Sequence, residues 1–92
     1  MNKPRAGATV LTFANALTAV SEVMTNGHKL HGGSWEGGRL SDPECVSKST
    51  DSLMRHLLAE GSGEVKDEDG LRHDACVAVN ALMRLEARLR RT

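Results

Sequence analysis

The sequence of 92 residues contains no tyrosine, one phenylalanine, one tryptophan, two prolines and two cysteines. Cys45 and Cys76 are too few to form the disulfide framework of a small secreted protein, and no signal-peptide pattern precedes the first apolar segment. No apolar run reaches the roughly 18 residues that a membrane-spanning helix requires. We therefore expect a protein of the reducing cytoplasm that makes no contact with a membrane.

An excess of charge of one sign is also absent, because 12 basic residues balance 12 acidic residues. Nucleic-acid binding depends on a net basic face, so the composition gives no strong nucleic-acid signal. The charges are nevertheless separated along the chain. An acidic cluster, which is typical of a solvated loop, precedes basic residues that suit the last turns of a helix. The acidic residues are Glu60, Glu64, Asp67, Glu68, Asp69 and Asp74, and the basic ones are Arg84, Arg88, Arg90 and Arg91.

What the chain does contain is apolar residues at helical spacing, in three segments. Residues 1–8, which include Pro4 and Gly7, are predicted to form a flexible leader. The first helix is predicted over residues 9–25, with Gly27 as its left-handed C-terminal cap. Its apolar stripe consists of Val10, Phe13, Ala14, Leu17, Val20 and Met24.

The segment 27–40 is predicted to be a loop, because it holds five glycines. It also contains Trp35, the only tryptophan of the chain. The indole ring either covers the core or contacts a ligand, and the sequence leaves both interpretations open.

A second helix is predicted to begin at a capping box formed by Ser41 and Glu44 and to end at Gly61. Asp51 and Arg55 stand four residues apart on it and are expected to pair along its surface. A further polar row at the same spacing is either a surface row or a group that binds metal or acts as a general base. This row consists of Ser52, His56 and Glu60.

The third helix is predicted from about Gly70 to Leu89, with Asp69 as its N-terminal cap. Between Ala75 and Met83 its only polar residue is Asn80, so this part is expected to be enclosed. A buried Asn80 without partners would cost about 1–3 kcal/mol. The polar row of His73, Cys76 and Asn80 therefore either ties the core together or lines a pocket.

These segments predict a single all-α domain over residues 9–92. Three helices with two long polar loops form a small three-helix bundle unit, and a fourth helix would complete the usual packing. We therefore expect oligomerisation through an apolar helix face that one copy leaves exposed.

The common motifs of catalytic chemistry are absent: the chain has no phosphate-binding loop, no paired CxxC zinc site, no HExxH helix and no serine nucleophile elbow. What remains is a carboxylate-rich segment near His56 and His73. Carboxylates and waters can hold a divalent metal whose remaining ligands are substrate phosphates. In that arrangement Arg55 would neutralise phosphate charge through its planar guanidinium group.

Four stretches carry a family resemblance: 29-KLHGGSW-35, 51-DSLMRHLLA-59, 63-GEVKDEDGLRH-73 and 82-LMRLE-86, with Asn80 before the last. Together they resemble a family of small, mostly phage-encoded dATP/dGTP diphosphohydrolases, relatives of the MazG-like all-α nucleotide pyrophosphohydrolases. The resemblance covers the chain from about Leu17 to Glu86. Leu30 stands where the family has tyrosine, and Cys76 stands where relatives have a second histidine. The chain also lacks the paired-glutamate helix that holds the metals in MazG-like enzymes.

The resemblance implies a nucleotide pocket in a protein of the cytoplasm, which is the host's if the protein is phage-encoded. The implied catalytic and metal-binding residues are Glu64, Asp67 and Asp69, with Mg²⁺ or Mn²⁺ as the cofactor. The implied nucleotide-binding residues are Lys29, Trp35, Asp51, Arg55, His56, His73 and Asn80.

Three functions follow as hypotheses. The first is a metal-dependent pyrophosphohydrolase that converts dATP or dGTP to the monophosphate and pyrophosphate. The second is a non-catalytic sponge that captures a nucleotide or cyclic nucleotide and so blunts host signalling or immunity. The third is a helical protein-interaction module in which Asn80 only ties helices together.

Overall fold

The computed structural model describes residues 3–33 and 35–91, and these residues form an all-helical structure. The helices are α1 (Ala6–Thr12), α2 (Ala14–His31), α3 (Trp35–Ser41), α4 (Cys45–Gly61) and α5 (His73–Arg90). Outside them, the described residues include one isolated antiparallel bridge, between Lys66 and Arg72. The predicted all-α class is confirmed. The three long helices α2, α4 and α5 correspond to the three predicted ones, and α1 and α3 are additional.

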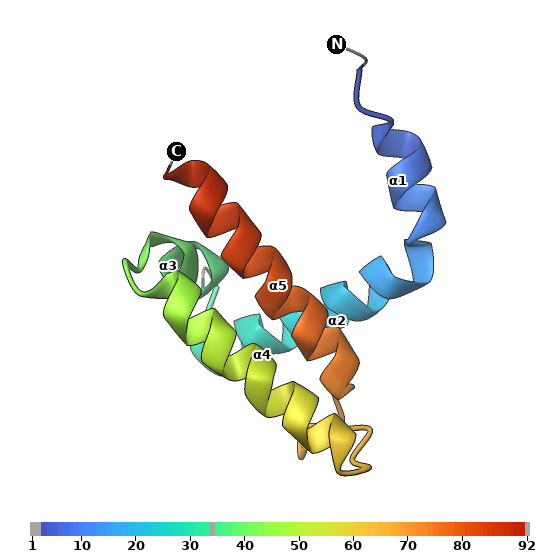
Figure 1. The fold of residues 1–92 in the computed structure, drawn as a ribbon, viewed down its shortest axis with the longest axis vertical. Coiled ribbons are helices and arrows are strands. Elements are labelled where there is room, and N and C mark those ends of the chain that lie inside the picture. Colours follow the sequence, from blue (N-terminus) through green and yellow to red (C-terminus); the bar gives the residue numbers. More distant parts are fainter. Residues whose placement is uncertain (1–2, 34, 92) are drawn as a thin grey trace.

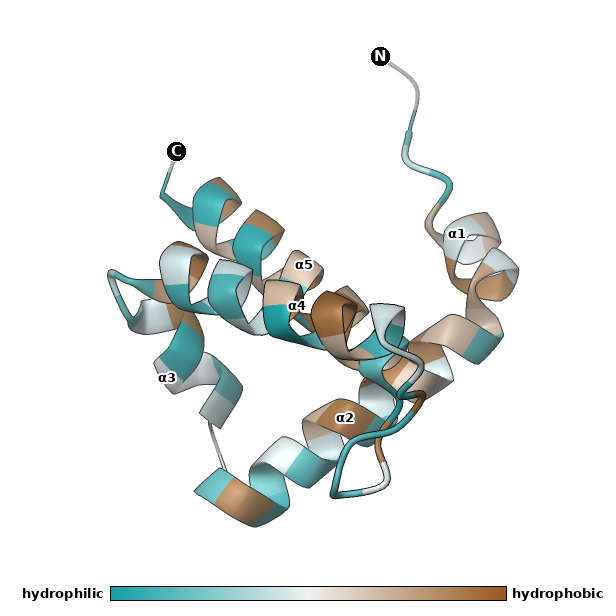
Figure 2. Ribbon diagram, turned by 60° about the horizontal axis from the view of Figure 1, so that its bottom comes forward, coloured by the Kyte–Doolittle hydropathy of each residue, from teal (hydrophilic) through white to brown (hydrophobic). Residues whose placement is uncertain are grey.

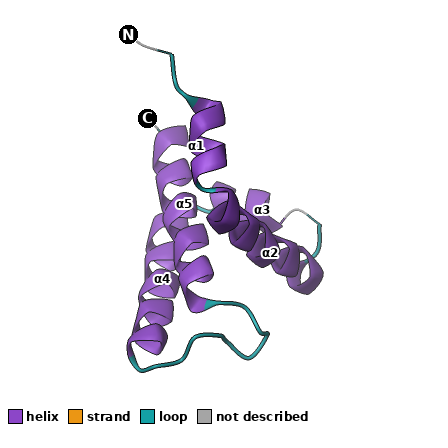
Figure 3. Cartoon of the chain, turned by 90° about the vertical axis from the view of Figure 1, so that its right-hand side faces the viewer, coloured by secondary structure: helices purple, strands orange, loops and turns teal. Residues whose placement is uncertain are grey.

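The helices α4 and α5 lie side by side as an antiparallel hairpin that is joined by the long loop 62–72 (Figures 1 and 3). Cys45 and Ser49 on α4 and Ala87 on α5 are fully buried. Their small side chains allow the two helix backbones to approach closely, because the distance between packed helices depends on the side chains at the contact.

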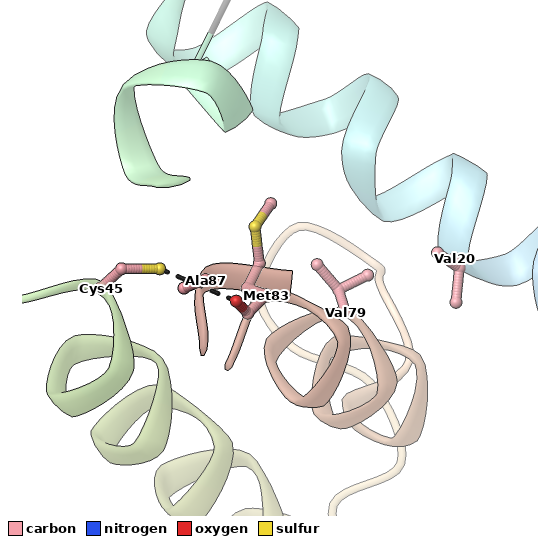
Figure 4. Packing of buried hydrophobic residues seen from close by; sticks show 5 residues of the cluster. All are labelled: Val20, Cys45, Val79, Met83 and Ala87. Atoms are coloured by element: carbon pink, nitrogen blue, oxygen red, sulfur yellow. Dashed lines mark hydrogen bonds between the residues drawn. The ribbon is translucent and has the colours of Figure 1, made fainter. Parts of the chain in front are cut away.

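The hydrophobic core lies where α2 crosses this hairpin. It consists of Val20 from α2, Cys45 from α4, and Val79, Met83 and Ala87 from α5 (Figure 4). The Cys45 Sγ atom lies 3.9 Å from the Met83 carbonyl oxygen, which links the two helices of the hairpin. A core built from so few large side chains is small, as expected for a chain of this length.

The predicted helix over residues 9–25 is wrong as one continuous element. The chain bends by 81° between α1 and α2 at Phe13, where the sequence has neither proline nor glycine. α1 therefore projects from the body (Figure 1), and none of its seven residues is buried. Part of the predicted leader is helical too, since α1 begins at Ala6; residues 1–2 lie outside the described residues.

In the described part of the chain, no single helix is long and apolar enough to cross a membrane, although the bent pair of α1 and α2 has the required length and composition.

The predicted loop over residues 27–40 is also wrong, because α2 continues through Gly27 to His31 and α3 follows it. A glycine does end α2, but it is Gly32, which has a φ of +86° and donates its N–H to the His28 carbonyl. Gly27 serves a different purpose. A Cβ atom there would overlap the indole ring of Trp35, whose Nε1 donates to the Met24 carbonyl at 3.1 Å.

Two predicted helix caps are corrected. Ser41 is the last residue of α3 and its hydroxyl donates to the Gly37 carbonyl, so it does not cap α4. Instead the Asp42 carboxylate accepts the Glu44 N–H at 2.8 Å. Asp69 does not cap α5, which begins four residues later at His73. The turn before α5 is ordered instead by Asp67, whose carboxylate accepts the Asp69 N–H at 2.9 Å.

Candidate functional site

The polar residues of α4 and α5 face each other across the hairpin. The Asn80 side-chain amide donates to the Ser52 hydroxyl at 3.2 Å and to the Cys76 carbonyl at 2.9 Å. Both amide hydrogens of this buried residue are therefore hydrogen-bonded, so Asn80 avoids most of the free-energy cost of burying an unpaired polar group. Asn80 ties the hairpin together, one of the two roles that the sequence left open.

The second polar contact lies closer to the loop 62–72, by four residues on α4 and seven on α5. The Nδ1 atoms of His56 and His73 are 2.8 Å apart, and the two rings are tilted by 49°. His73 is 5% exposed, whereas His56 is half-buried. The Nε2 atom of His73 lies 3.4 Å from the Glu64 carboxylate. We refer to His56, Glu64 and His73 as the histidine cluster.

The loop 62–72 holds Glu64 against His73. One Asp67 oxygen accepts the N–H groups of Asp69 at 2.9 Å and Leu71 at 3.0 Å, which closes a tight turn. The turn also uses Gly70, at a φ of +79° that favours glycine. The His73 N–H donates to the Val65 carbonyl at 3.0 Å, next to Glu64. Asp67 is thus an organiser of the loop that positions the cluster.

Burial and charge favour the neutral forms of His56 and Cys76. Burial lowers the pKa of His56 below its usual value, repulsion between the His56 and His73 rings when both are protonated lowers it further, and the Asp67 carboxylate opposes both effects. Burial raises the pKa of the Cys76 thiol to about 11. At neutral pH the His56 ring is therefore an uncharged imidazole and Cys76 is a thiol rather than a thiolate.

Other predicted site residues lie away from these contacts. Lys29 is exposed on α2, and Trp35 packs on Gly27 and against the core. Asp51 and Arg55 are exposed on α4, and within the described ranges they do not form the expected ion pair. The charge of Arg55 nevertheless acts on His56, its neighbour in sequence.

The predicted metal ligands are not assembled in one place. Among residues 3–33 and 35–91, no group of three or more His, Cys, Asp or Glu side chains is arranged to hold a metal ion. Glu64 faces His73, Asp67 is bonded to backbone N–H groups, and Asp69 is exposed. These donors do not fit Mg²⁺ or Mn²⁺ within one copy of the described chain, since such ions take several oxygen ligands.

Ser52 is a contact residue that was not among the predicted site residues, although it belongs to the predicted polar row with His56 and Glu60. Ser52 and His56 are four residues apart on α4, and Asn80 and His73 are seven apart on α5. Those spacings put each pair on one helix face. Matching the two faces would have predicted both cross-hairpin contacts.

Comparison with known proteins gives one family. The sequence model of a family described as dATP/dGTP diphosphohydrolase, N-terminal, matches residues 2–92. No curated protein and no solved structure matches the chain.

Proposed function

The chain belongs to the dATP/dGTP diphosphohydrolase N-terminal family, and from this membership we propose that it binds a purine deoxynucleoside triphosphate at the loop end of the α4–α5 hairpin. The pocket would be bordered by the histidine cluster and by the loop 62–72.

One observation carries the proposal. Three residues that the family resemblance implies, and that are distant in sequence, contact one another: His56, Glu64 and His73. The half-buried His56 imidazole is a polar group of the kind that orients a ligand, and its partner His73 lies 3.4 Å from the Glu64 carboxylate. Arg55 is the nearest exposed cation on α4, and a guanidinium group binds phosphate in a bidentate manner.

The family description names a hydrolytic reaction, so cleavage of the nucleotide to the monophosphate and pyrophosphate is part of the proposal. A divalent metal would supply charge neutralisation and an activated water. The carboxylates of one chain do not form that metal site, so the chemistry would require donors beyond those assembled in the described residues. The internal contacts of Glu64 and Asp67 favour a second candidate, in which the chain captures the nucleotide without cleaving it.

The test is an incubation of the protein with dATP, dGTP, other nucleoside triphosphates and cyclic nucleotides, with and without Mg²⁺ or Mn²⁺. Products are separated by ion-exchange chromatography, and binding is measured by calorimetry. A monophosphate formed only with metal supports hydrolysis, and intact nucleotide in the protein fraction supports capture. If no nucleotide binds, the proposal fails and the helical-module hypothesis gains.

Two variants locate the site. Arg55→Ala is expected to weaken triphosphate binding at least tenfold, because a charge-assisted pair is worth about 1.5–3 kcal/mol. The matched control is Arg88→Ala, an exposed arginine on α5 far along the chain from the loop. Equal losses in both variants would mean that binding depends on general charge and not on this site.

A further inference from the structure

We propose that Glu64, His73 and His56 form a directional hydrogen-bond relay that fixes His56 as its Nδ1–H tautomer and presents the unprotonated Nε2 atom to an N–H donor of the bound purine base. The identity of the ligand rests on the proposed function, whereas the tautomer does not.

The first step of the relay is set by Glu64. The Nε2 atom of His73 is buried, has no hydrogen-bond partner among the described residues, and lies 3.4 Å from the Glu64 carboxylate. A carboxylate only accepts hydrogen bonds, so a lone pair on Nε2 would face negative charge. The proton therefore belongs on Nε2. The Glu64 side chain is 56% exposed and is free to shorten this contact, whereas the enclosed His73 ring is held in place.

The second step follows from the first. A neutral imidazole with its proton on Nε2 has an acceptor at Nδ1. The Nδ1 atom of His73 is 2.8 Å from Nδ1 of His56, a distance that requires one of the two to donate. Because His73 already carries its proton on the other nitrogen, His56 is the donor. The His56 Nε2 atom is then left unprotonated.

The third step concerns what this nitrogen can bind. His56 is half-buried, so part of the residue is accessible to a ligand, and its lowered pKa keeps it uncharged at neutral pH. The negative charge of Asp67 acts on His56, and an unprotonated ring nitrogen accepts a hydrogen bond, so it suits a donor group and not a phosphate oxygen. Adenine and guanine both carry an exocyclic amine that donates. The relay therefore places the purine base near His56. The guanidinium group of Arg55, the preceding residue on α4, would then bind the phosphates.

The tautomer is measured on the full chain without ligand, by long-range ¹H–¹⁵N correlation spectra of the histidine side chains at neutral pH. We expect His56 to carry its proton on Nδ1 and His73 to carry its proton on Nε2. A His56 ring protonated on Nε2 would overturn the relay, whether or not the protein binds nucleotides.

The direction of the relay is tested with Glu64→Ala, which removes an exposed side chain and so leaves the helices intact. We expect the His56 spectrum to lose its pure Nδ1–H pattern, while the matched variant Glu68→Ala, in the same loop, keeps it. Unchanged tautomers in Glu64→Ala would show that Glu64 does not set the direction, and would refute the proposal.

The base contact is tested with dATP and the purine deoxyriboside triphosphate that lacks the amine at C6. The wild-type protein is expected to bind the amine-free analogue about threefold to tenfold more weakly than dATP, the worth of one hydrogen bond. The variant His56→Phe, which keeps a flat ring, is expected to bind the two equally. Equal binding by the wild type would refute the base contact, whereas absence of all nucleotide binding would refute the proposed function and leave the tautomer measurement standing.

Discussion

At the scale of single residues, the polar groups between α4 and α5 have two kinds of role. Asn80 satisfies its amide hydrogens inside the protein, on Ser52 and on its own helix, and so acts as a structural tie. The histidine cluster ends at His56, which is half-buried, whereas Asn80 is buried. The sequence predicted that Asn80 would be buried and would need partners. The sequence could not show whether Asn80 links two helices or lines a ligand pocket, because its partner Ser52 lies 28 residues away on α4.

Cys76 provides a pH-dependent prediction at this scale. Its folded-state pKa is raised from 9.0 to about 11 by burial, so the fold favours the neutral thiol. This contribution to stability is fully present below the unfolded-state pKa and is lost as the pH rises through about 11. A shift of this size corresponds to at most about 3 kcal/mol, and screening by solvent reduces the effect on stability. We expect urea denaturation to show stability falling over this range more steeply in the wild type than in Cys76→Ala.

The control for that comparison is the pair of proteins at about pH 8, where the thiol is neutral in both states and the two curves should differ by a constant cavity cost. Parallel loss of stability in both proteins up to pH 11 would show that other groups, such as lysines, account for the alkaline effect.

At the scale of the elements, the long helices α4 and α5 could be predicted from the helical spacing of their apolar residues. Which of those residues are buried could not, since Leu57 and Leu58 of α4 are exposed whereas Cys45 and Ser49 are buried. The ends of the helices could not. The sequence predicts that Gly27 caps a helix. In the structure its lack of a side chain allows the indole ring of Trp35, eight residues later, to pack against it. Five glycines in 27–40 read as a loop, although two of them lie within α3. In each case a tertiary contact overrides a local preference.

Gly27 and Gly38 make a matched pair for a prediction on helix stability. Alanine normally stabilises a helix by about 0.5–1 kcal/mol relative to glycine. Nothing lies within 4 Å of a Cβ atom built at Gly38, so Gly38→Ala is expected to show this gain. At Gly27 the added methyl group would displace Trp35 and break its bond to Met24, so Gly27→Ala is expected to lose about 1–3 kcal/mol.

Thermal unfolding measures both stabilities, and the fluorescence of Trp35, the only tryptophan, reports whether the indole has moved. A stabilised Gly27→Ala protein with unchanged fluorescence would show that the Trp35 contact does not hold α3 against α2.

At the scale of the whole molecule, the described chain leaves apolar side chains outside its core. Val10, Leu11 and Phe13 lie on or next to the projecting α1 and are at least half exposed. Leu82 and Leu85 on α5 are exposed beside an open groove whose floor includes Met24, Leu40 and Val79. Hydrophobic stretches are visible on both helices in Figure 2. The bend at Phe13 that separates α1 from the body has no signal in the sequence, since the apolar stripe continues through it.

These two surfaces lead to the prediction that copies of the chain associate, with α1 of one copy in the α5 groove of the other. Each copy carries both surfaces, so a two-fold arrangement satisfies both at once. Burying the exposed α1 side chains would stabilise the dimer at about 25 cal/mol per Å² of apolar area.

Leu85→Glu places a charge in the groove and is expected to shift the protein to monomer in light scattering after gel filtration. Leu58→Glu, on the exposed side of α4, is the matched control and should leave the mass unchanged. A wild-type monomer at all concentrations would refute the association, and a monomer produced only by Leu58→Glu would move the interface to α4.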